Sequence, residues 1–144
     1  MPRKAKFLLL AVVLTGLVSL NNARAEELDN FELCATNPDG EEWTNSSGSE
    51  RIVIKAKGRW TGGGVNPMHT PTGSPRIPDH PSKLVAPNLK AGALIMERES
   101  GKYEMVGRGG VFSIHTDETV KFIFNDYWDA YADNSGCINI AVSQ

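Results

Sequence analysis

Cysteine is scarce in this sequence, and neither an internal repeat nor a linker divides the chain. Only two of its 144 residues are cysteine. No segment repeats apolar side chains at the 3.6-residue spacing of an amphipathic helix. With 40% hydrophobic and 22% charged residues, the composition excludes a collagen-like, coiled-coil or wholly disordered protein. We therefore expect one domain.

Apolar runs long enough to span a membrane are also absent. The longest run, Phe7 to Leu20, has fourteen residues, whereas a spanning helix needs roughly 18 or more. Lys4 and Lys6 precede this run and Ala23-Arg24-Ala25 follows it, which is the pattern of a signal peptide. We expect residues 1–25 to be a signal peptide and 26–144 to be the mature domain of a secreted or periplasmic protein. A buried helix is the alternative for the apolar run.

Basic residues are few in the predicted mature domain. The whole chain has a net charge of −2, but four of its 15 basic residues and none of its acidic ones lie in the first 25 positions. The remainder has 11 basic and 17 acidic residues, a net charge of −6. This charge argues against nucleic acid or an anionic membrane surface as a partner, because both require a basic face.

Short runs with alternating polarity indicate β-strands. In residues 51–57 the alternation predicts that Ile52, Ile54 and Ala56 share a buried face. Turn-forming clusters separate seven such runs, namely 31–36, 51–57, 92–97, 103–106, 111–114, 119–125 and 137–142. Seven short strands at close spacing predict an all-β fold, an antiparallel sandwich or barrel.

The two cysteines, Cys34 and Cys137, lie near opposite ends of the predicted mature domain. Export would place them where disulfides persist, so we expect them to pair. A bridge that closes a loop of about 100 residues contributes about 4–5 kcal/mol in the chain-entropy model. It would make the first and last strands neighbours and join the edges of a sandwich. Two unpaired, buried thiols are the alternative.

The segment from Thr61 to Asn88 interrupts the series of strands. Its 28 residues include six prolines and four glycines, together with His69 and His80. Six positions without an N–H donor exclude a central strand, and a connection of this length is usually functional or disordered. Because the prolines restrict the backbone, we expect a shaped surface.

Carboxylate and amide side chains are concentrated in residues 125–136. Three carboxylates and two amides lie within these twelve residues, and their oxygens are the hard ligands that calcium prefers. On composition alone, a calcium site and an ordinary acidic turn both remain open. Tyr127, Trp128 and Tyr131 lie among the acids, which favours an exposed surface that binds ligands such as sugars. The alternative is that Trp128 and Tyr131 fold back as loop plugs.

Catalytic motifs are absent from the sequence. It has three histidines, His69, His80 and His115, but no nucleophile elbow, no H-E-x-x-H pair and no phosphate-binding glycine loop. Asp126 and Asp133 are a conceivable pair for glycoside cleavage, but carboxylates that share a calcium ion stay ionised and are poor general acids. We therefore expect that the protein is not an enzyme.

Residues 124–126 together with 131–136 resemble the calcium loop of the PA-IL-like (LecA-type) bacterial galactose-binding lectins. Further matches occur in the same order as in that family, at 52–58, Trp60, His80-Pro81 and 92–96. The resemblance extends roughly from Phe31 to Val142. It implies a jelly-roll-like antiparallel β-sandwich with one calcium ion, to which neighbouring hydroxyls of a galactose-type sugar bind directly.

Carried over by position, the resemblance also implies site residues. Asp126, Asp133 and Asn134 would supply side-chain oxygens to calcium, and Gly62 and Ala130 would supply carbonyl oxygens. The implied sugar contacts are His80, Lys83, Asp126, Tyr127, Trp128, Ala130 and Asp133. Glycans would be the partners, and the family resemblance suggests a homo-oligomer, a tetramer.

Several positions depart from the family pattern. Asp133 stands where the family usually has Asn, Ala130 where it has Thr, and Lys83 where a glutamine contacts the sugar. Trp128-Asp129 replaces a Pro-Gly pair. Oxygen ligands are retained at these positions, so the resemblance supports a calcium site more strongly than it supports a preference for galactose.

We expect an exported calcium-dependent lectin. The alternative is an exported β-sandwich in which calcium is structural and the surface binds a protein partner.

Overall fold

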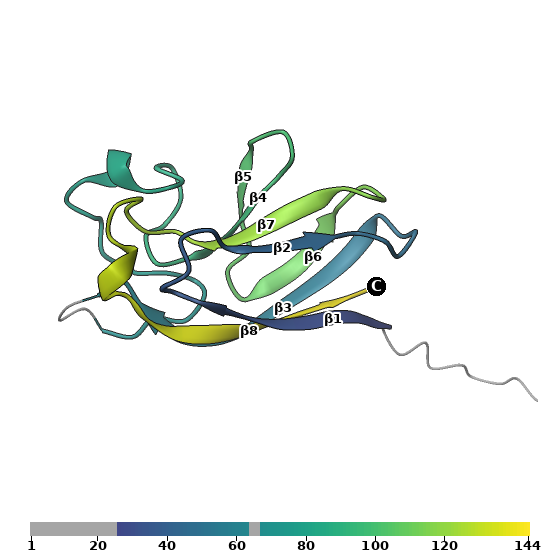
Figure 1. The fold of residues 1–144 in the computed structure, drawn as a ribbon, viewed down its shortest axis with the longest axis horizontal. Coiled ribbons are helices and arrows are strands. Elements are labelled where there is room, and N and C mark those ends of the chain that lie inside the picture. The colour runs from purple at the N-terminus through teal and green to yellow at the C-terminus, as the bar shows by residue number, and fades with distance from the viewer. Residues whose placement is uncertain (1–25, 64–66) are drawn as a thin grey trace, which may run out of the picture.

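The computed structural model describes residues 26–63 and 67–144, and these form two four-stranded antiparallel sheets (Figure 1). The strand order is β1-β8-β3-β6 in one sheet and β2-β7-β4-β5 in the other. The elements are β1 (Glu27–Cys34), β2 (Glu41–Thr44), β3 (Arg51–Thr61), η1 (Pro81–Lys83), β4 (Leu94–Glu97), β5 (Tyr103–Met105), β6 (Gly109–Ser113), β7 (Thr119–Phe124), η2 (Tyr131–Asp133) and β8 (Ser135–Ser143). The predicted β-sandwich is confirmed. The predicted signal peptide lies outside the described residues.

Alternating side chains explain how the two sheets pack. Ile52, Ile54 and Ala56 of β3 are buried, as the polarity pattern predicts, and β8 alternates in the same way. The ring of Trp60 from β3 meets that of Phe124 from β7, with centroids 4.6 Å apart. Both side chains are fully buried, so this pair joins one sheet to the other. Burial of one such apolar side chain stabilises the fold by about 1.5–3 kcal/mol.

Cys34 and Cys137 form the predicted disulfide. The two residues are direct partners in the β1–β8 ladder, so the first and last strands are neighbours, as predicted. However, β8 lies between β1 and β3 inside its sheet. The prediction that the bridge joins the edges of the sandwich was therefore wrong, since it ties one edge strand to the adjacent interior strand.

The described residues form one strand more than the seven that the sequence predicts. β2 contains only four residues, two of which are glutamates, and glutamate is depleted in strands. Trp43 of β2 nevertheless faces the core and is 7% exposed, and the whole strand pairs with β7. Burial of this indole and pairing with β7 therefore outweigh a weak local preference.

The proline-rich segment follows the surface at one end of the sandwich, near η1 and η2 (Figure 1, left). In the described part of Thr61 to Asn88 there is no strand beyond the last residue of β3. Three isolated bridges attach the segment to the remaining structure, namely Trp60–His69, Thr72–Ala93 and Leu84–Tyr127. The prediction that it forms no central strand is confirmed.

No helix within the described ranges has the length and apolarity needed to cross a membrane.

Candidate metal centre

Strand pairing brings three loops together at this end of the sandwich. Antiparallel pairing of Thr61 with Ser135 places the residues after β3 beside those before β8. β7 of the other sheet ends at Phe124, and the chain then continues through Asp126 toward the same place. The site is therefore built from the C-terminal ends of β3 and β7 and the N-terminal end of β8.

Gly62 and Gly63 leave room for two carboxylates. A Cβ atom on Gly62 would lie 3.2 Å from Oδ2 of Asp126, and one on Gly63 would overlap the carboxylate of Asp133. Gly63 also has a φ of 78°, which side-chain-bearing residues rarely adopt. Both carboxylates thus lie against the same glycine pair.

Two buried oxygens in this region have no hydrogen-bond partner among the described residues. They are Oδ2 of Asp126 and Oδ1 of Asn134. The other atoms of these side chains are used, because Oδ1 of Asp126 accepts the Tyr127 N–H at 2.8 Å and Nδ2 of Asn134 donates to the Ala35 carbonyl at 3.0 Å. These bonds hold both side chains in place. A buried acceptor without a partner costs free energy, and such an oxygen is suited to bind a cation or a water.

The electrostatics of Asp126 also favour a cation. Burial raises the pKa of its carboxyl above the usual range, and the charges of Asp133 and Asp129 act in the same direction. The Tyr127 N–H and the Asn134 amide act against them. A cation beside Asp126 would favour the ionised form. Two carboxylates, an amide oxygen and nearby carbonyls form a hard donor set, which fits calcium.

Asn125 connects the acidic loop, residues 125–136, to the end of the proline-rich segment. Its side chain is fully buried, donates to the carbonyls of Ala86 and Lys90, and accepts the Ala86 N–H at 2.9 Å. Its backbone carbonyl accepts the Gly92 N–H at 2.7 Å. One buried amide therefore fixes two loops relative to each other.

Tyr131 does not reach the surface. Its hydroxyl donates to the Phe124 carbonyl at 2.6 Å, and its ring packs edge-on against Phe124. Burial raises the pKa of this phenol well above its usual range. Of the two aromatics for which the sequence left folding back open, Tyr131 is thus a loop plug, whereas Trp128 is 67% exposed.

A cavity of about 420 Å³ opens beside the two carboxylates. Four of the five predicted calcium ligands line it, namely Gly62, Asp126, Ala130 and Asp133, and so does Tyr127. The fifth, Asn134, is buried with its free oxygen. The lining also includes His69, Arg76 and Asp79 of the proline-rich segment. The sequence assigns these three no role, because no local pattern indicates which part of a loop faces a cavity.

Three predicted sugar contacts lie outside this lining. His80 is exposed, and its backbone N–H donates to the Tyr127 hydroxyl at 3.1 Å. Lys83 accepts the Trp128 N–H on its carbonyl, and its Nζ lies 3.8 Å from Oδ2 of Asp129. These contacts keep the η1 turn against the acidic loop. The roles of His80, Lys83 and Trp128 at a sugar remain predictions.

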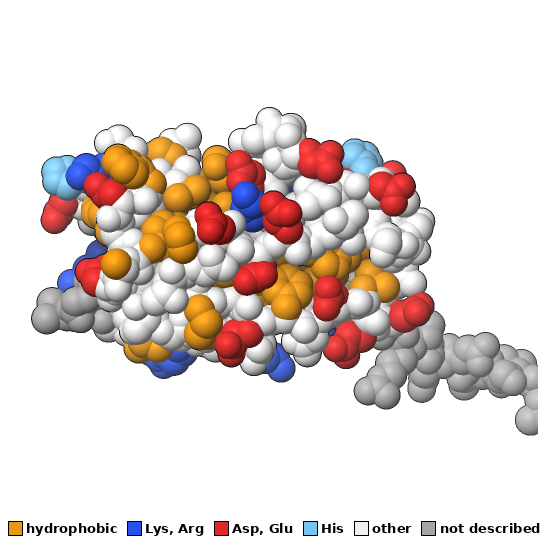
Figure 2. Space-filling view, viewed as in Figure 1, with side chains coloured by type: hydrophobic (Ala, Val, Ile, Leu, Met, Phe, Trp, Pro, Cys, Tyr) orange, Lys and Arg blue, Asp and Glu red, His pale blue; other side chains and the backbone are white. Residues whose placement is uncertain are grey.

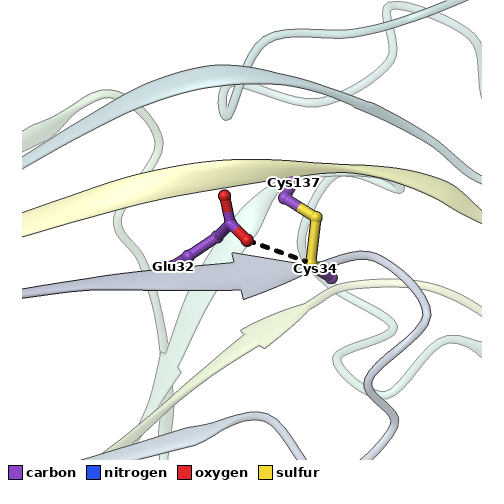
Figure 3. Close-up of side chains that lie close together, drawn as sticks. All are labelled: Glu32, Cys34 and Cys137. Atoms are coloured by element: carbon purple, nitrogen blue, oxygen red, sulfur yellow. Dashed lines mark hydrogen bonds between the residues drawn. A yellow bond between two sulfur atoms is a disulfide. The ribbon is translucent and has the colours of Figure 1, made fainter.

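A second cluster of side chains that could ligate a metal contains Glu32, Cys34 and Cys137 (Figure 3). Both sulfurs belong to the disulfide, so neither is a thiolate that could bind a metal. Oε1 of Glu32 lies 3.8 Å from Sγ of Cys34, which has no proton to donate. This cluster is therefore not a metal centre.

No protein-family model matches the chain, and no curated protein matches it either. Among solved structures, it is similar to the EclA N-terminal domain, which is described as a PllA-like lectin. The similarity covers 82% of this chain and 97% of that one, with 25% sequence identity and a TM-score of 0.62. The β-sandwich therefore resembles a lectin-like domain over most of its length, and this likeness does not single out the LecA type.

Proposed function

We propose that this lectin-like β-sandwich is a calcium-dependent carbohydrate-binding protein of LecA-related type, with galactose-type saccharides as ligands. The observation that carries the proposal is the pair of buried, unpaired oxygens on Asp126 and Asn134, together with the cavity of about 420 Å³ that Asp126 and Asp133 line. Unpaired buried acceptors are suited to bind an ion or water, and a concave cavity next to Asp126 accommodates a small ligand.

The ligand set is the one that the sequence predicts. Side-chain oxygens of Asp126, Asp133 and Asn134 and the carbonyls of Gly62 and Ala130 would hold calcium. Calcium binds six to eight oxygens, so these five groups leave coordination positions for two neighbouring hydroxyls of a sugar. Asp126 would also accept a hydrogen bond from one hydroxyl. Tyr127 lines the cavity and anchors the His80 backbone, so it holds the cavity wall in place.

We further propose that the protein is exported, binds saccharides without catalysing a reaction, and forms a homo-oligomer. The Cys34–Cys137 disulfide supports export, because such bonds persist in oxidising compartments. Several sites in one assembly would increase the avidity for multivalent glycans.

Calorimetric titration of methyl galactoside, with calcium and with excess chelator, tests the function. We expect binding only with calcium, and saccharide binding that survives chelation would contradict the mechanism. The variant Asp126→Asn should lose calcium binding. Asp129→Asn is a matched control, because it makes the same charge change in the same loop but its carboxylate lies near Lys83 and outside the cavity lining. It should bind calcium within about threefold of the wild type.

The alternative function, structural calcium with a protein partner, predicts a different result. Calcium would then raise the melting temperature while no saccharide binds at saturating calcium. The alternative is motivated by Lys83 and Trp128, which could fill or close the sugar pocket, and neither residue lines the cavity. The geometry therefore favours saccharide binding.

A further inference from the structure

His69 is a cavity-lining side chain to which the sequence and the proposed calcium site assign no role. It follows the glycines of the proline-rich segment and lies in the same cavity as Asp126 and Asp133. It is half-buried, whereas His80 of the same segment is exposed and outside the lining.

The backbone of His69 is fixed to the core of the sandwich. Its N–H donates to the Trp60 carbonyl at 2.7 Å, and its carbonyl accepts the Trp60 N–H at 3.0 Å. Trp60 is fully buried, and its indole N–H donates to the Gly92 carbonyl at 2.9 Å. His69 is thus held like a residue in a strand, although it belongs to a loop.

The imidazole of His69 lies against a wall made by a glycine. A Cβ atom on Gly92 would be 3.7 Å from Cδ2 of His69 and 3.8 Å from a ring carbon of Phe124. The ring therefore lies close to Gly92, which in turn is fixed by the Asn125 carbonyl. Within the described residues, neither ring nitrogen of His69 has a hydrogen bond or an ion pair. The polar atoms of this ring are therefore available to a ligand in the cavity.

We propose that His69 is a specificity-determining residue of the saccharide site, which hydrogen-bonds a ligand hydroxyl through a ring nitrogen. This role rests on the proposed function. A neutral imidazole has one donor and one acceptor nitrogen, and a sugar hydroxyl can match either. Because the backbone of His69 is already fixed, binding does not incur the entropy cost of ordering this part of the loop. His69 thus selects among saccharides, while the carboxylates hold the ion.

The test uses the full chain with His69→Ala and His69→Gln, and His115→Ala as a matched control. His115 lies between β6 and β7, beyond the end of β7 that is remote from the site, and its ring pairs with Glu50. Calorimetry measures methyl galactoside at saturating calcium and, in separate titrations, calcium alone. His69→Ala should weaken the sugar at least tenfold and leave calcium affinity within twofold. His69→Gln should recover part of the loss, and His115→Ala should match the wild type.

NMR of the histidine rings gives a second readout that a merely structural role would not change. The ring protons of His69 should shift on sugar addition, and those of His115 should not. Sugar affinity of His69→Ala within twofold of wild type, or parallel loss of calcium and sugar affinity, would overturn the role of His69 alone. A wild-type protein that binds no saccharide with calcium present would contradict the proposed function, and the role of His69 with it.

Discussion

Gly63 lies against the carboxylate of Asp133. Gly63 and Gly48 have nearly the same φ, 78° and 76°. A Cβ atom on Gly63 would overlap Asp133, whereas one on Gly48 would meet nothing within 4 Å. Alanine substitutions at Gly63 and Gly48 therefore distinguish the effect of backbone strain, which both share, from a direct effect on Asp133, which only the first has.

We expect Gly63→Ala to weaken calcium binding at least tenfold, because the added methyl displaces Asp133. Gly48→Ala should cost about 1 kcal/mol of stability through its positive φ and leave calcium affinity unchanged. Calcium titration by calorimetry and urea unfolding measure the two effects. Equal calcium affinity in both variants would contradict the assignment of Asp133 as a ligand.

Arg98 holds two carboxylates at the other end of the sandwich. It lies 3.0 Å from Glu104 and 3.2 Å from Glu118, and its side chain is mostly buried. Burial by itself would raise the pKa of Glu104, but the hydrogen bonds and charges of Arg98 and Lys102 outweigh it and hold that pKa below its usual value.

This lowered pKa predicts a pH-dependent contribution to stability. Because the folded state binds the Glu104 proton more weakly than the unfolded state, the stabilisation is present above about pH 4.5. It is lost as the pH falls through the folded-state pKa. Glu104→Gln should therefore be less stable than the wild type by about 0.5–1 kcal/mol at pH 7, and the difference should shrink at pH 3. Urea unfolding at both pH values measures this, and a difference that does not change with pH would contradict it.

The edge strands β1 and β2 carry acidic side chains at Glu27, Asp29, Glu32, Glu41 and Glu42. Figure 2 shows red side chains spread over the face that these strands form. Charged edges discourage pairing with another chain, so the acids protect two otherwise open strands. β1 gains further support from its seven-residue pairing with β8 and from the disulfide.

Replacing both cysteines should weaken the attachment of β1. The bridge links residues 103 positions apart, which corresponds to about 4–5 kcal/mol in the chain-entropy model. The Cys34→Ser/Cys137→Ser protein should lose about that much stability but keep its β-sheet circular dichroism, because the β1–β8 ladder remains. Denaturant unfolding measures the loss. A change below about 1 kcal/mol would show that the unfolded chain is not constrained as the model assumes.

The molecule as a whole should be stabilised by calcium. An ion that binds only the folded state stabilises it by about 2.7 kcal/mol when present at about 100 times its Kd. For a domain of this size the melting temperature should rise by about 10 °C and fall again with chelator. Magnesium at the same concentration should have a smaller effect, because it demands octahedral geometry and loses its waters reluctantly. Equal shifts with both ions would contradict a calcium site.

Patterns within one strand were readable from the sequence. The alternation in β3 correctly predicts that Ile52 and Ile54 are buried, because side chains of a strand alternate between faces. The pairing of Cys34 with Cys137 was predicted from the expected export together with the presence of only two cysteines, and the structure confirms it over two unpaired thiols. The strand β2 could not be predicted from its own residues. Trp43 is buried because β2 pairs with β7, which is far away in the sequence.

The sequence by itself determined the all-β class, the alternation of buried side chains in β3 and the acidic composition of residues 125–136, because these depend on residue type and local spacing. Only the tertiary structure decided that Tyr131 is a plug, that Asp126 and Asn134 have unpaired oxygens, and that His69 lines the cavity. These facts depend on which loops meet at the ends of β3, β7 and β8. Packing between segments that are distant in the sequence determines which loops lie next to each other, and no local sequence pattern predicts it.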